Sequence, residues 1–146
     1  MNVSRESVFV TLFGLLAPLK PTPFLTVSRR WEPYQNFAPE QQPALFVMQD
    51  NQRGEQKAYG LQKWTLKASL WIYCYQGAED DFVASTTLNN LLDLVEAAIQ
   101  PAPGFERQML GGIVQNCFID GEIDVVEGVL GQQSVARIPI TILTGD

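Results

Sequence analysis

The chain has 146 residues, of which 46% are hydrophobic and 18% are charged. This is the size of about one ordinary domain, and the composition indicates a globular chain with its own hydrophobic core rather than a disordered one. Sixteen Asp and Glu against ten Lys and Arg give a formal net charge of −6, which argues against a surface that grips nucleic acid through its phosphates.

The first predicted element is an N-terminal helix. Apolar residues recur at helical spacing from Val8 to Leu19, Ser4 stands where an N-cap is needed, and the Pro-containing segment 20–23 ends the pattern. The apolar run is as long as the core of a signal peptide, but Glu6 and the lack of an A-x-A cleavage site oppose that interpretation, and the run is too short to span a bilayer as a helix. We therefore expect a core helix of a protein made inside the cell, with no membrane partner.

Three strands are predicted next. The first two are expected at 24–31 and 44–49, on either side of a loop at 31–43. A second loop, 50–60, leads into the clearest strand of the chain, 63–75, where apolar residues alternate without a break.

The second half of the chain predicts one helix and a hairpin. A polar turn at 76–81 precedes a helix at 84–99, which Ser85 can cap. A strand at 113–128, a turn, and a last strand at 134–144 follow; because Pro139 cannot donate to a ladder, the last strand is either an edge strand or one whose pairing is interrupted there. The predicted fold class is α+β: a single domain over 1–146, with a largely antiparallel sheet of about five strands and two helices packed on one face.

The two predicted helices can cover only one face of the sheet, so the aromatic side chains on the opposite face need another cover. Either a partner subunit covers them, or the loop 31–43 folds back over them. The candidate subunit-interface residues are Trp71, Tyr73, Tyr75, Phe118, Trp31, Tyr34 and Phe37.

Few residues of the chain suggest catalysis. Without histidine, Ser-His-Asp and Cys-His systems and His-containing zinc sites are excluded, and two cysteines cannot form a Cys₄ site. Cys74 and Cys117 lie in apolar runs and are expected to be buried free thiols. Lys67 and Ser69 share a strand face and are the residues that could form a Ser-Lys dyad. Such a pair is commonplace on an open strand, so we expect no dyad here. We expect no enzyme, no metal and no cofactor.

Four carboxylates, Asp120, Glu122, Asp124 and Glu127, lie close together near the C-terminus. As a calcium loop starting at Asp120 the segment fails, because Val125 stands where Gly is needed and Gly131 where the bidentate Glu is needed. Strand alternation explains the spacing instead, with Phe118 and the first three carboxylates on one face and Cys117, Ile119, Ile123 and Val125 on the other. That acidic face is either solvated or a functional electrostatic surface.

Several phrases of the chain resemble the tail terminator (tail completion) proteins of long-tailed bacteriophages, a group of small minor tail proteins. The order helix, strands, helix, two strands is also similar to that family. The phrases are SRESVFVTLFGLL, QPALFVMQ, KWTLKASLWIY, STTLNNLLDLVEAAI and GEIDVVEGVLGQQSVARIPITILTGD.

The resemblance implies a ring, commonly of six subunits, that caps the tail tube, stops its growth and presents a surface to the head. The implied partners are further copies of the chain, the tail tube protein and the head-completion protein, with genomic DNA passing through the lumen of the virion's neck. A lumen that repels DNA suits an acidic chain, so we expect the acidic residues 120–127 on the lumen or on a ring face.

Three alternatives remain at this point. One is a head-tail connector, either adaptor or stopper, which is similar in size. Another is a subunit of another contractile or secretion assembly. A small enzyme would have to work with carboxylate, Lys, Tyr or Cys groups alone. The loops 31–43 and 50–60 are the candidates for contact with the tube or the head, because they are long and polar.

Overall fold

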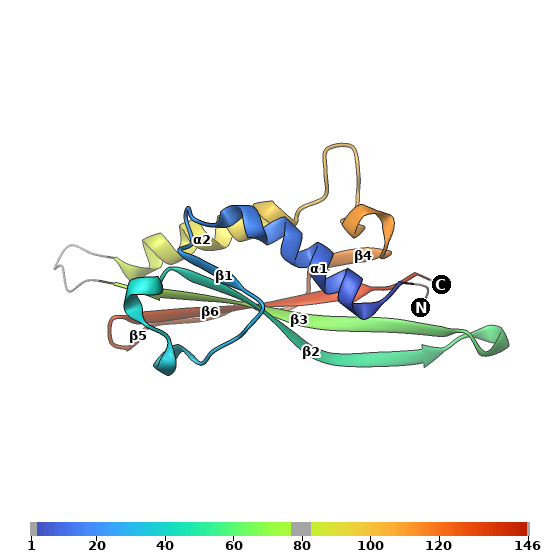
Figure 1. Ribbon diagram of the computed structural model, residues 1–146, viewed down its shortest axis with the longest axis horizontal. Coiled ribbons are helices and arrows are strands. Elements are labelled where there is room, and N and C mark those ends of the chain that lie inside the picture. The colour runs from blue at the N-terminus through green and yellow to red at the C-terminus, as the bar shows by residue number, and fades with distance from the viewer. Residues whose placement is uncertain (1–2, 77–82, 146) are drawn as a thin grey trace.

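The computed structural model describes residues 3–76 and 83–145, so the predicted turn at 76–81 lies, apart from Gln76, outside the described residues. The predicted α+β class is confirmed. Both helices lie on one face of a curled, mostly antiparallel sheet (Figure 1). The elements are α1 (Arg5–Leu16), β1 (Thr26–Ser28), β2 (Ala44–Gln56), β3 (Gln62–Tyr75), α2 (Ala84–Ile99), β4 (Asn116–Ile119), β5 (Asp124–Leu130) and β6 (Gln133–Leu143).

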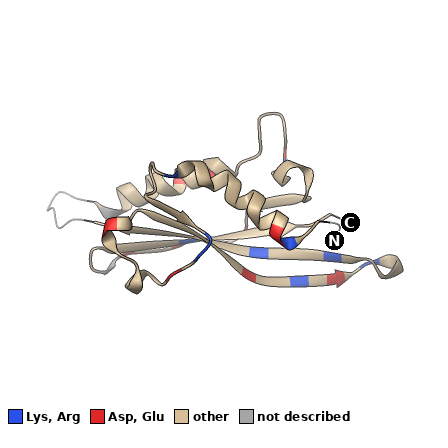
Figure 2. Cartoon of the chain, viewed as in Figure 1, with Lys and Arg blue, Asp and Glu red and all other residues tan. Residues whose placement is uncertain are grey.

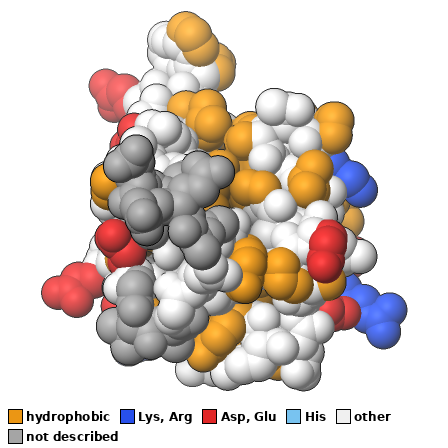
Figure 3. Space-filling model, turned by 90° about the vertical axis from the view of Figure 1, so that its left-hand side faces the viewer, with side chains coloured by type: hydrophobic (Ala, Val, Ile, Leu, Met, Phe, Trp, Pro, Cys, Tyr) orange, Lys and Arg blue, Asp and Glu red, His pale blue; other side chains and the backbone are white. Residues whose placement is uncertain are grey.

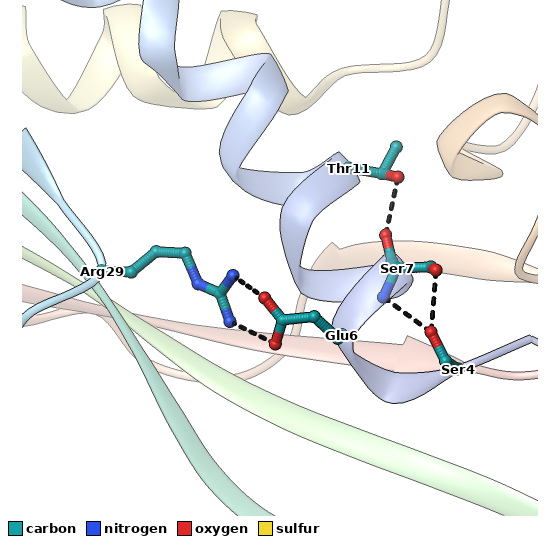
Figure 4. Close-up of polar contacts among 5 residues, drawn as sticks. All are labelled: Ser4, Glu6, Ser7, Thr11 and Arg29. Carbon is teal, nitrogen blue, oxygen red and sulfur yellow. Dashed lines mark hydrogen bonds and ion pairs between the residues drawn. The ribbon is translucent and has the colours of Figure 1, made fainter.

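The start of α1 follows the sequence closely. Ser4 is the N-cap, and its Oγ accepts a hydrogen bond of 3.1 Å from the Ser7 amide (Figure 4). On the other side of the first turn, Arg29 donates to both carboxylate oxygens of Glu6, at 2.5 and 3.2 Å, which lowers the pKa of Glu6. The strand predicted at 24–31 is shorter than expected: β1 covers only Thr26–Ser28 and pairs with β2 in parallel.

The second helix has the predicted bounds but not the predicted cap. It begins at Ala84, so Val83 occupies the N-cap position, and no side chain caps the helix there. Ser85 lies inside the first turn.

The main core lies between the two helices and the sheet. The alternating residues of β3 from Leu66 to Cys74 are buried at its centre. The buried residues of the helices in this cluster are Val8, Phe9, Leu12, Leu16, Leu88, Leu91, Val95 and Ile99. On β5, by contrast, Val125 on the predicted apolar face is 49% exposed.

The hairpin of β2 and β3 is much longer than predicted. The segment 50–60 is not a loop: β2 continues to Gln56, and its pairing with β3 resumes after a register shift between Gln49 and Gln52. Residues 51–62 are all exposed. We call residues 50–63 the arm; it projects beyond the rest of the sheet at the right of Figure 1.

The single strand predicted at 113–128 is two strands, β4 and β5, which pair in turn with β6. Ile119 lies opposite Ile140 and Asp124 opposite Arg137, so the connection 120–123 has four residues where β6 has two. Pro139 is one of those two. It has no N–H to donate, although its carbonyl accepts from the Asp120 amide at 3.0 Å. Because β6 lies between β3 and these two strands, the interrupted-pairing alternative for Pro139 is confirmed and the edge-strand alternative is wrong.

None of the helices in 3–76 or 83–145 has both the length and the hydropathy to cross a membrane.

Candidate functional site

The face of the sheet opposite the helices, here called the second face, is partly covered by residues 31–43, here called the cover loop. Phe37 lies edge-on to Phe46, with ring centroids 5.1 Å apart, and 6.2 Å from the ring of Tyr73. The Tyr73 hydroxyl donates to the Glu32 carbonyl at 2.6 Å. These residues form a second, smaller core with Ala44 and Val135. The loop-covering alternative of the sequence is thus realised over this part of the second face.

The cover loop changes which aromatic residues can meet a partner. Tyr73 has no exposed surface and Phe37 keeps 8%, so both belong to the interior and neither offers a side chain to another subunit here. Burial also raises the pKa of the Tyr73 phenol to about 12. The other candidates remain partly accessible: Trp31 and Tyr75 are exposed by 36% and 43%, and Trp71, Tyr34 and Phe118 are half-buried.

A polar junction centred on Arg137 continues the second face beyond the cover loop. The Arg137 guanidinium lies 3.3 Å from the Asp50 carboxylate and 3.9 Å from that of Asp124. Ser69 donates to the same oxygen of Asp50, and the guanidinium lies 5.9 Å from the centre of the Trp71 ring. Four strands, β2, β3, β5 and β6, therefore meet through one cation that faces two carboxylates and an aromatic ring.

The acidic segment does not form the uniform face that its alternation predicts. Asp120 and Glu122 lie in the connection between β4 and β5 rather than in a strand. Asp120 accepts a hydrogen bond of 2.9 Å from the Thr141 hydroxyl, and Asp124 faces Arg137. Glu122 and Glu127 are exposed. Asp120 and Asp124 are exposed as well, so all four carboxylates face solvent and the two aspartates differ only in having a partner within the chain.

Neither thiol is placed for chemistry. Cys117 and Cys74 are 2% and 3% exposed, and burial raises the pKa of Cys117 to about 12 and that of Cys74 above its ordinary value. Within the described ranges, His, Cys, Asp and Glu form no cluster of three or more that could hold a metal ion.

Two further surface features are the arm, whose residues 50–60 the sequence marked as a candidate contact segment in the form of a loop, and a hollow near α2, which the sequence did not mark. The tip of the arm carries Tyr59, which is fully exposed, and Leu61, which is 58% exposed. The hollow has a volume of about 390 Å³ and lies in the segment that follows α2. It is lined by Ala102, Phe105, Arg107, Gln108, Met109, Gly111 and Gly112. The aromatic residue before Gly60 was the available signal for the arm tip; no pattern marked the hollow.

Charge is distributed unevenly over the molecule. Segments of both charges follow one another along the arm in Figure 2. In the sequence, the charged residues of the arm are Asp50, Arg53, Glu55, Lys57 and Lys63. The arm is therefore slightly cationic on a chain whose net charge is −6. Figure 3 shows the opposite end of the molecule, where hydrophobic side chains are interspersed with polar ones and the cations lie at one margin.

Neither the known protein-family models nor the curated protein sequences contain a match to this chain.

Proposed function

We propose that the chain is a structural subunit of a long-tailed bacteriophage that assembles into a ring, commonly of six copies, at the end of the tail tube. There the ring ends elongation of the tube and offers a surface to the head-completion protein, while genomic DNA passes through its lumen. The support is the family resemblance of the phrases quoted above, together with an α+β domain whose most prominent surface features suit assembly.

The observation that carries the proposal is the arm. A two-stranded hairpin is at best marginally stable by itself in water, and residues 51–62 are all exposed. The arm also ends in Tyr59 and Leu61, two apolar side chains in water. Covering them with another protein would remove apolar surface from water at about 25 cal/mol per Å². An arm of this kind gains stability in an assembly, so it favours a subunit role.

The charge of the chain agrees with a DNA passage. A net charge of −6 disfavours contacts with phosphates, so DNA would slide rather than stick. Glu122 and Glu127 are exposed and are the residues of the acidic segment best placed to face such a lumen. Asp120 and Asp124 already have Thr141 and Arg137 as partners within the chain.

The test is electron microscopy of phage lysates made with and without the gene, with the gene restored in trans as the control. Loss of the protein should give tubes of unregulated length that fail to join filled heads, and complementation should restore normal tails. Tails of normal length without heads attached would assign the chain to the head-tail connectors instead. Normal virions in the absence of the protein would overturn the proposal.

A further inference from the structure

The tip of the arm holds an aromatic side chain away from the rest of the chain. Tyr59 has a φ of 63°, in the left-handed region that non-glycine residues rarely adopt, and Gly60 follows with a φ of 75°. Such a conformation costs on the order of 1 kcal/mol or more, and strained residues cluster at functional sites. Tyr59 is also fully exposed, so none of the described chain covers the ring that this turn presents.

Contacts from α1 and from Trp64 hold the base of the arm, below the tip that carries Tyr59. Gly54 lies directly opposite Trp64, and the indole packs so closely that a Cβ at Gly54 would be 3.0 Å from it. The Arg5 guanidinium lies 4.5 Å from the centre of the Trp64 ring, and its Nε donates to Gln52 at 2.6 Å. Helix α1 is thus tied to both strands of the arm. An element ordered before it binds loses less entropy on binding.

The hollow beside α2 is an apolar receptor that is formed in the free chain. Gln108 fixes its wall: the side-chain amide donates to the Gln100 carbonyl at 3.0 Å, its oxygen accepts from the Leu110 amide at 3.1 Å, and its backbone carbonyl accepts from the Cys117 amide at 2.8 Å. Phe105, on the rim, is 60% exposed. A volume of about 390 Å³ lies within the range of pockets that enclose small aromatic groups.

We propose that Tyr59 of one copy inserts into the hollow around Phe105 and Met109 of the neighbouring copy. The inference rests on the proposed ring and names the contact that closes it. Tyr59 is fully exposed, so it does not fill the hollow of its own chain, and Figure 1 places the arm tip beyond the end of the sheet. The tip and the hollow are different surfaces of the chain, so each copy can insert its own tip into one neighbour and receive the tip of another neighbour in its hollow. Repetition of such a contact generates a ring when the rotation closes.

Charge favours the same pairing. Lys57 lies two residues before Tyr59. Arg107 lines the hollow itself, whereas the neighbouring Glu106 lies in an adjoining depression. A second carboxylate, Glu96, lines that depression together with Glu106. The two carboxylates outnumber Arg107 there, so the slightly cationic arm would approach a surface of net negative charge, which aids orientation more than affinity.

Disulfide trapping tests the contact directly. Tyr59→Cys and Ala102→Cys are made in separate chains, mixed and oxidised; the native thiols, Cys74 and Cys117, are buried and should not react. The mixture should give a disulfide-linked heterodimer that neither variant gives alone. In the control mixture, Tyr59→Cys is combined with Leu94→Cys, whose position is exposed on α2, and no dimer should form. Equal trapping in both mixtures, or none in either, would overturn the contact.

Native mass spectrometry separates this contact from the ring itself. Tyr59→Ser should raise the concentration at which rings dissociate by about tenfold or more, whereas Tyr59→Phe should leave it nearly unchanged, since the ring supplies the apolar contact. Circular dichroism should show both variants folded, because Tyr59 touches no core residue. Unchanged rings with Tyr59→Ser would refute the contact and leave the proposed function standing. A wild-type chain that forms no ring would refute both.

Discussion

The cover loop makes the clearest energetic prediction, for the substitution Phe37→Ala. Complete burial of Phe makes its replacement by Ala cost about 3–5 kcal/mol. Phe37 retains 8% of its surface and lies in a single loop that can collapse into the space, so we expect the lower end, about 3 kcal/mol. Its edge-on contact with Phe46 is part of that loss.

Urea unfolding followed by circular dichroism measures this loss. With a slope of about 2 kcal/mol per M, the midpoint should fall by roughly 1.5 M at an unchanged slope. Leu94→Ala is the control, because Leu94 is 43% exposed on α2 and should cost less than about 1 kcal/mol. Protein concentration must be equal in all samples, since assembly adds to apparent stability. A midpoint for Phe37→Ala that matches the control would refute the burial of the second face by the cover loop.

Three further predictions concern pH, the polar junction and the acidic segment. Burial raises the pKa values of Tyr73 and Cys117 to about 12 from ordinary values of 10.0 and 9.0. The stability that these two groups contribute is therefore complete below about pH 9 and is lost as the pH rises toward 12. The urea midpoint should fall over that window. Arg137→Met should destabilise the fold by about 2 kcal/mol in the wild-type background and by roughly 1 kcal/mol less in the Asp50→Asn background. Urea unfolding of the two single variants and the double variant measures this difference. Glu122→Lys should slow DNA ejection from otherwise complete virions, measured by the rate of potassium release or dye uptake.

Each of these has a contrary outcome. A urea midpoint that stays constant from pH 8.5 to 11 would show that the phenol and the thiol ionise freely in the folded chain. Additive costs for the two substitutions at the junction would mean that the ion pair contributes nothing. For ejection, Asp93→Lys, at an exposed position of α2, is the control; equal slowing by both variants would remove the acidic segment from the lumen.

The sequence predicted the elements whose apolar residues keep one regular period along their whole length. The strand 63–75 and the helix 84–99 were both placed to within a residue or so, because their apolar residues recur at the period of one buried face. The sequence of the arm predicts a loop because both faces of its two strands are exposed to water. The alternation of apolar and polar residues that marks a half-buried strand is therefore absent.

The break between β4 and β5 was invisible for a different reason. The connection 120–123 has two more residues than the stretch of β6 that it faces. Because side chains in a strand alternate with a period of two, two extra residues leave Cys117 and Val125 on the same face, as in a continuous strand. Pro139 was the correct signal, although it lies on the partner strand. Contacts between distant segments were equally hidden: Phe37 against Phe46, and Arg137 between Asp50 and Asp124, depend on register across the sheet.

The central claim is that the chain forms a ring at the end of the tail tube that faces the head, and a cryo-electron microscopy reconstruction of the neck of the virion tests it most directly. The account predicts a ring of copies of this chain between tube and head, with each Tyr59 against the neighbouring Phe105 and with Glu122 toward the channel. A neck in which other chains fill that position, with this chain elsewhere or absent from the purified virion, would contradict it.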